Sequence, residues 1–233
     1  MTESKPVAVV IQEPYAYWRI ELRSLGACRQ ALGPDVLNSF CRCFVQVDRL
    51  TSLIGFAYLS RMQGGRTSRA FAHNLQTMVW FIVGTLSELV TATRDLRGAL
   101  AQRGVLHSES DAWRALQAVE DRWKSDSFFR TMCHVAAFHV DPGLIDRGLA
   151  LMEGAGAATL SEGQGGRFQH SSMRLGLEAL FNGTGMGLAD FDRFMKDVSE
   201  DHGISTAIHD AFLLALDAAG IPVEEADADA SPA

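Results

Sequence analysis

The chain has 233 residues, of which 47% are hydrophobic and 21% are charged, and its formal net charge is −7. This composition is ordinary for a globular protein, and the length allows one large domain or two small ones with a sizeable core. The acidic balance argues against a protein that coats nucleic acid, because such binding depends on neutralising phosphates. A local basic site for RNA remains compatible with it.

The acidic charge is concentrated at the C-terminal end of the chain. Residues 1–70 carry nine Lys or Arg against five Asp or Glu, whereas residues 188–233 carry two against eleven. The last residues are also small, so we expect 223–233 to form an acidic flexible tail. The preceding residues, 1–222, are predicted to form a single helical domain.

Neither a membrane span nor a secretion signal is predicted. The most apolar stretch, 78–86, is about half of the ~20 residues that a spanning helix needs, and the N-terminus has only a short apolar run. The expected location is therefore the cytoplasm, with no membrane as a partner. The four cysteines lack the second pair that a zinc finger needs, so buried reduced thiols are expected at 28, 41, 43 and 133.

The first part of the chain shows long stretches of helical periodicity. Helices are expected over 15–32, 35–62 and 69–101, with Gly33-Pro34 separating the first two because proline cannot continue a helix. One buried face of the second helix is predicted to carry Leu37, Phe40, Phe44, Val47, Leu50, Ile54 and Leu59. In the third helix, Trp80, Phe81 and Val83 lie off the main apolar stripe. A surface this wide is either buried inside the bundle or covered by a partner.

The remainder of the chain reads as shorter helices separated by turn residues. They are expected from a cap at 108–111 to 124, then over 125–138, 142–153, 171–181 and 188–219. Residues 154–170 are rich in glycine and interrupt them, with a short β-hairpin near 157–169 as one option. We therefore predict an all-α fold, a multi-helix bundle of about seven or eight helices. It comprises a helical block to about 153, the glycine-rich interruption 154–170, and C-terminal helices over 171–219.

The densest group of chemically capable residues lies in 129–141. Arg130 and His134 are four residues apart and share a helix face, whereas His139 lies at the expected helix end, close to Asp141. A histidine there can be oriented by the carboxylate and stabilised as a cation by the helix dipole. It acts either as a cap that bridges to the next loop or as a catalytic group. Arg130, His134 and His139 are the candidate catalytic residues.

Metal binding is the second chemical option in the sequence. His134 and His139 miss the four-residue spacing that aims two imidazoles at one ion, and no Glu-x-x-His pair of the di-iron kind appears. Glu200-Asp201-His202 with His209 forms a polar cluster, which we interpret as a solvated face rather than a metal site. We expect no metal and no cofactor, and we keep a helical bundle with a His-ligated metal or haem as an alternative.

The segment Met132-Cys133-His134-Val135-Ala136-Ala137-Phe138-His139-Val140-Asp141 resembles the Leu-Arg-Asn-x-x-x-Phe-His-x-Asp stretch of HEPN-like helical proteins. The resemblance, to the abortive-infection type among others, extends over about 35–150. It implies a helical bundle, often dimeric, and in many members a metal-independent ribonuclease in which four to six residues separate Arg from His. His139 matches the family histidine, whereas Cys133 stands where Arg is expected and His134 where Asn is expected.

Two readings of the function follow from this resemblance. The first is a HEPN-like interaction or regulatory component of the defence or toxin–antitoxin type, forming a homodimer with a further protein partner as an option. The second is a metal-independent endoribonuclease that uses Arg130, His134 and His139, with RNA held at a local basic site. In that case the imidazole would move a proton and the guanidinium would neutralise phosphate charge. Whether Arg130 can replace the arginine missing at Cys133 separates the two.

Overall fold

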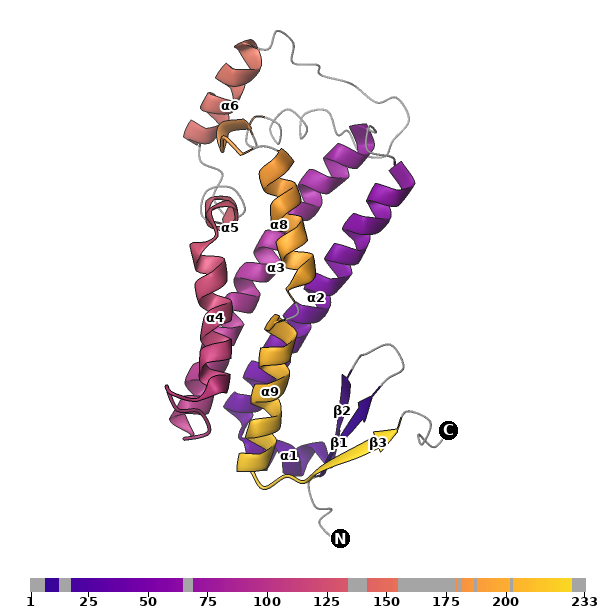
Figure 1. Ribbon diagram of the computed structural model, residues 1–233, viewed down its shortest axis with the longest axis vertical. Helices are drawn as coiled ribbons and strands as arrows, with labels where there is room; N and C mark the ends of the chain where they lie inside the picture. Colours follow the sequence, from indigo (N-terminus) through magenta and orange to yellow (C-terminus); the bar gives the residue numbers. More distant parts are fainter. Residues whose placement is uncertain are drawn as a thin grey trace. The chain divides into compact units, whose positions relative to one another are not determined.

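The computed structural model describes residues 7–12, 18–64, 69–133, 142–154, 179, 182–186, 188–201 and 203–227. The protein is mostly helical, with a small three-stranded sheet (Figure 1), which confirms the predicted helical fold. The helices are α1 (Leu25–Leu32), α2 (Pro34–Gly64), α3 (Arg69–Gln102), α4 (Asp111–Ser125), α5 (Ser127–Thr131), α6 (Pro142–Gly154), α8 (Leu188–Glu200) and α9 (Gly203–Ala218). The strands are β1 (Val7–Gln12), β2 (Trp18–Arg23) and β3 (Val223–Asp227).

Most predicted helices appear close to their expected bounds. α2, α3, α4 and α6 correspond to the helices expected from periodicity and from glycine and proline punctuation. α3 is followed by a left-handed Gly104, whose N–H donates to the carbonyl of Ala101 at 3.0 Å. The stretch 188–219 consists of two helices, α8 and α9, with Asp201 between them. The optional hairpin near 157–169 lies outside the described residues, as does nearly all of the predicted helix 171–181.

The small sheet corrects the prediction at both ends of the chain. β1 pairs antiparallel with β2 and parallel with β3. The helix expected over 15–32 is therefore wrong over 18–23, and it begins only at Leu25. Ile20 and Leu22 are half-buried while Glu21 and Arg23 are exposed, which is the two-residue period of a strand. Residues 223–227, expected in the flexible tail, form β3; the division into one domain and a tail stays a prediction.

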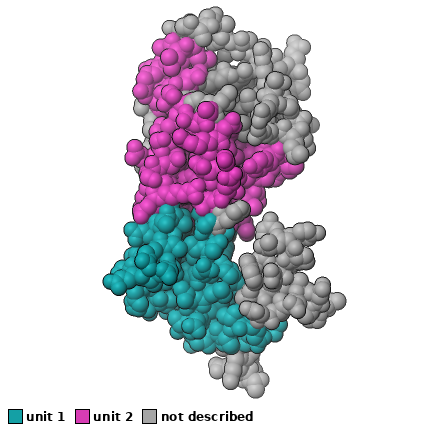
Figure 2. All heavy atoms as spheres, in the orientation of Figure 1, with its two compact units in different colours: residues 1–45, 91–120, 203–233 teal, residues 46–90, 121–202 magenta. Residues whose placement is uncertain are grey.

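The chain divides into two compact units, shown in different colours in Figure 2. Unit 1 contains residues 1–45, 91–120 and 203–233, and unit 2 contains residues 46–90 and 121–202. An aromatic cluster joins α2 and α9 in unit 1. Phe40 and Phe212 are buried in it, whereas Phe44, predicted on the buried face of α2, is 36% exposed. Phe212 packs edge-on against Phe40 with ring centroids 4.6 Å apart, and against Phe44 at 5.7 Å. Such ring pairs add to the stabilisation that comes from burying apolar area.

A charged pair is buried in unit 1 between α3 and α4. Arg97 Nη2 lies 2.9 Å from Glu120 Oε1, and the two side chains are 15% and 3% exposed. The guanidinium also lies over the ring of Trp113, 4.6 Å from its centroid. Trp113 Nε1 in turn donates to Gln117 Oε1 at 3.0 Å. Within unit 1, the carboxylate of Glu120 and the ring of Trp113 thus hold one arginine in a largely dry environment.

A buried thiol lies in the same unit. Cys43 of α2 is fully buried, and this burial raises the pKa of its thiol to about 12 although Thr93 hydrogen-bonds to it. Cys41, two residues earlier, is exposed. The buried reduced thiol expected at position 43 is therefore confirmed, whereas the expectation of burial at position 41 is wrong.

Cys43 is expected to resist thiol reagents while the protein is folded. At pH 8 a maleimide should label Cys41 in native protein and reach Cys43 only after unfolding, because the reactive thiolate is disfavoured at Cys43. The raised pKa belongs to the folded state, so the free energy of unfolding should fall by up to about 1.4 kcal/mol per pH unit between about pH 9 and 12. Peptide mass spectrometry, with Cys41→Ala and Cys43→Ala as controls, checks the labelling. Equal labelling of both cysteines in folded protein would contradict this burial.

Candidate functional site

The structure places one of the three candidate catalytic residues. Arg130 lies in the last turn of α5 and its side chain is exposed. Asp126 caps the start of α5, because its Oδ1 accepts a hydrogen bond from the N–H of Phe129 at 2.7 Å. His134 and His139 lie outside the described residues. Convergence of the three side chains therefore stays a prediction.

Cys133, where the family pattern expects arginine, has a structural contact. Its Sγ donates to Ser87 Oγ of α3 at a distance of 3.3 Å, and its side chain is half-buried. The neighbouring Met132 is fully buried. The position where the resemblance expects an arginine thus carries a thiol that contacts α3.

An aromatic cluster packs α5 against α4 and α8. Phe128 stacks on Phe194 of α8 with ring centroids 4.8 Å apart, and Trp123 packs edge-on against Phe129 and Phe194 at about 6 Å. All four side chains are buried. Because these rings join α4, α5 and α8, the backbone that carries Arg130 is anchored in the core of unit 2.

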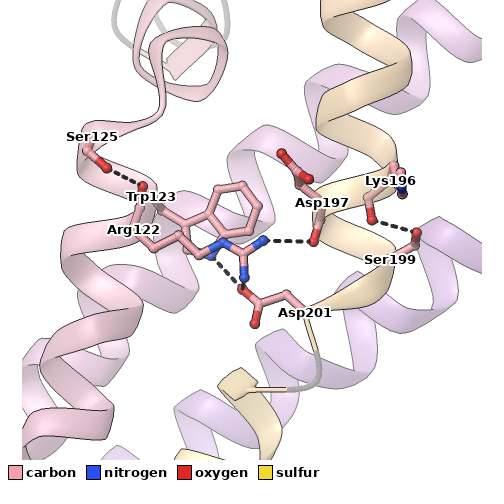
Figure 3. A network of polar contacts seen from close by, with 7 residues as sticks. All are labelled: Arg122, Trp123, Ser125, Lys196, Asp197, Ser199 and Asp201. Atoms are coloured by element: carbon pink, nitrogen blue, oxygen red, sulfur yellow. Dashed lines mark hydrogen bonds and ion pairs between the residues drawn. The ribbon is translucent and has the colours of Figure 1, made fainter.

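A polar network links Asp201, which directly follows α8, to α4 (Figure 3). Asp201, 7% exposed, accepts a hydrogen bond from Trp123 Nε1 at 3.2 Å and lies 3.3 Å from Arg122 Nη1. Arg122 Nη2 also donates to the backbone carbonyl of Asp197, at 3.4 Å. The expectation that Asp201 belongs to a solvated face is therefore wrong. The sequence pattern cannot reveal this role, because Arg122 and Trp123 are nearly eighty positions away.

The network does not present an open site for chemistry. Both the carboxylate of Asp201 and the indole of Trp123 are buried, and each is satisfied by the other. His209, the other member of the sequence cluster, has its Nδ1 3.6 Å from Asp210 Oδ1, and His202 lies outside the described residues. Within the described ranges, no group of three or more His, Cys, Asp or Glu side chains is arranged to hold a metal ion.

A different feature of unit 2 is a set of three exposed, large apolar side chains on α2 and α3. Phe56, Leu59 and Phe81 are 58%, 54% and 60% exposed, and we call these three residues the outer face. Leu59 was predicted on the buried face of α2, and this is wrong. The five-residue step from Ile54 to Leu59 turns the helix about 140° away from the buried side. Of the three residues noted in α3, Val83 is buried and Phe81 is exposed.

The outer face lies away from the contacts that α2 and α3 make inside unit 2. Tyr58 Oη donates to Ser199 Oγ of α8 at 3.2 Å, so this side of α2 faces α8. Phe56 is two residues earlier, about 200° around the helix. Likewise Ser87 faces Cys133, and Phe81 lies about 120° from it around α3. Apolar side chains are therefore exposed on both helices, away from these two contacts.

Neither a scan against protein-family models nor searches of curated proteins and of solved structures gave a match to this chain. In the part of the chain that the structure describes, none of the helices combines the length and the apolar character needed to cross a membrane.

Proposed function

We propose that this chain is a HEPN-like helical protein that works as an interaction or regulatory component, with a homodimer as its working form. The observation that carries the proposal is the outer face, with Phe56, Leu59 and Phe81 each more than half exposed. Burying one such side chain stabilises an assembly by roughly 1.5–3 kcal/mol. A role in defence or in a toxin–antitoxin pair rests on the sequence resemblance alone.

Charged side chains beside the outer face favour a second copy as the partner. Arg49 lies seven residues before Phe56, and Glu88 lies seven residues after Phe81, so each shares a side of its helix with that phenylalanine. Both charged side chains are exposed. One copy therefore presents a cation on α2 and an anion on α3, and this arrangement is complementary to itself.

The helix bounds set the relative heights of these groups. α2 ends at Gly64 and α3 begins at Arg69, so the two helices are antiparallel neighbours joined by a short connection. At ~1.5 Å per residue, Phe56 and Phe81 lie ~12 and ~18 Å from the connection, and Arg49 and Glu88 lie ~22 and ~28 Å from it. A two-fold axis parallel to the helices then sets Arg49 of each copy against Glu88 of the other, and Phe56 against Phe81.

Substitution of the outer face tests the proposal. Phe81→Glu and Phe56→Glu are expected to convert a dimer into monomer at micromolar concentration, because each places two carboxylates in the apolar centre of the interface. Sedimentation velocity over a concentration series measures the change. The matched control is Leu25→Glu, since Leu25 is 59% exposed but lies on α1 in unit 1. A dimer that survives both phenylalanine substitutions would rule out this interface.

A charge exchange tests the orientation separately. Arg49→Glu and Glu88→Arg should each weaken self-association about tenfold, at ~0.7 kcal/mol for each of the two pairs lost. In an equimolar mixture of the two variants, the heterodimer again opposes an arginine and a glutamate in both pairs, so mixing should restore the association that each variant loses alone. The double variant Arg49→Glu/Glu88→Arg makes the same test within a homodimer. It restores both pairs with their signs reversed and should regain wild-type affinity. Failure of the double variant to recover would reject this orientation while leaving the outer face as the interface.

The endoribonuclease reading and the metal or haem reading stay predictions, because His134, His139 and His202 lie outside the described residues. Among the described residues, the exposed guanidinium of Arg130 on an anchored α5 suits phosphate binding, but Cys133 occupies the family's arginine position and contacts Ser87. Association therefore has stronger support than catalysis.

A further inference from the structure

A cleft of about 320 Å³ opens in unit 1. It lies between the end of α1, the start of α2, the segment after α3 and the end of α9. Its walls are mostly small or apolar side chains: Ala31, Leu32, Val36, Ala215, Ala218 and Ala219. This volume is at the lower end of the range for small-molecule sites.

One charged side chain lines this cleft. Arg103 is exposed, and it forms no ion pair with a carboxylate of the described residues. Its guanidinium rests against Gly33, where an added Cβ would occupy the same space as the guanidinium nitrogens and carbon. Gly33 has a φ of 84°, which glycine adopts without strain. The turn between α1 and α2 therefore has room for the guanidinium only because residue 33 is a glycine.

Three helices, α1, α3 and α9, end at the cleft, and the partial negative charge of their ends favours the cation of Arg103 there. Helix ends carry partial negative charge on carbonyl groups that lack partners. Here the carbonyl of Leu100 near the end of α3 accepts from the N–H of Val105 at 3.0 Å, and that of Leu216 near the end of α9 accepts from Ile221 at 2.9 Å. Both carbonyls already accept backbone hydrogen bonds, so neither needs Arg103 as a donor.

We propose that this cleft binds a small amphiphilic carboxylate, such as a medium-chain aliphatic acid. The guanidinium of Arg103 pairs with the carboxylate, for which its planar fork is suited. The alanine-lined walls cover the hydrocarbon tail and remove it from water. The proposal is independent of the homodimer, because every residue that it uses belongs to unit 1.

Titration calorimetry of the full chain with three probes at constant ionic strength tests the proposal. Octanoate is expected to bind saturably, whereas octan-1-ol, which keeps the tail, and inorganic phosphate, which keeps only the charge, should bind at least tenfold more weakly. Arg103→Gln and Ala218→Leu should each weaken octanoate binding at least tenfold. Arg114→Gln, which removes a positive charge elsewhere in unit 1, should leave binding unchanged.

Three outcomes would overturn the proposal. They are no saturable octanoate binding up to millimolar concentration, equal binding of octan-1-ol, and unchanged octanoate affinity in Arg103→Gln. Circular dichroism of each variant verifies that it is folded. Because Arg103 and Ala218 are both exposed, substitutions there should preserve the fold.

Discussion

Replacing Glu120 by alanine is expected to lower the free energy of unfolding by about 3–5 kcal/mol, because it leaves a buried arginine without its carboxylate. Arg97 is only 15% exposed, and its Nη1 is buried with no hydrogen-bond partner, so it relies on Glu120 at 2.9 Å. Whole proteins are stable by about 5–15 kcal/mol. The loss of this one carboxylate would therefore remove a large share of the stability of the fold.

The matched control for Glu120 is an exposed ion pair at the start of the same helix, α4. Arg114 and Asp111 form an ion pair with side chains 67% and 97% exposed, and Asp111→Ala should change stability by no more than about 1 kcal/mol. Urea unfolding followed by circular dichroism measures both. Replacing the buried pair together, as Arg97→Met/Glu120→Leu, should recover most of the loss, since apolar side chains of similar size need no counter-ion. Similar losses for Glu120→Ala and Asp111→Ala would show that Glu120 is not buried with its partner.

Replacing Asp201 by alanine is expected to lower the free energy of unfolding by about 2–3 kcal/mol. The change removes the acceptor of the buried Trp123 N–H and leaves that donor unsatisfied, which is the larger part of the cost. It also removes the counter-charge of Arg122, whose side chain is half exposed, so this part of the effect is smaller. Urea unfolding is again the measurement.

Asp197→Ala is the control for Asp201, because Arg122 contacts only the backbone carbonyl of Asp197, which alanine retains. We expect that variant to lie within about 0.5 kcal/mol of wild type. Asp201→Asn should be intermediate, since its amide oxygen still accepts from Trp123. In a Trp123→Phe background the cost of Asp201→Ala should shrink markedly. An undiminished cost in that background would mean that the indole N–H does not depend on Asp201.

The helical part of this fold could be predicted because its signals are local. α2 and α3 follow from apolar residues at three- and four-residue steps and from the Gly33-Pro34 break. The sheet could not be predicted in this way, since β1 gains its second neighbour from β3, about 215 positions later. Trp18 and Leu22 satisfy both a helical and a two-residue period, and only the pairing partner decides between them.

The candidate sites could likewise be predicted only where their signal in the sequence is local. The exposure of Phe81 could be suspected from sequence, because it lies off the main apolar stripe of α3. The burial of Asp201 and Glu120 could not, because an acidic residue in a helix is usually solvated and its partner lies far along the chain. The contact of Arg103 with Gly33 could not be predicted either, because the two residues are seventy positions apart.

The mass of the wild-type protein in solution tests the central proposal most directly. Light scattering coupled to gel filtration, from low micromolar concentration upwards, should give twice the mass of one chain and should fall to the mass of one chain for Phe81→Glu. A wild-type protein that has the mass of one chain at every concentration up to several hundred micromolar would contradict a homodimer built on the outer face.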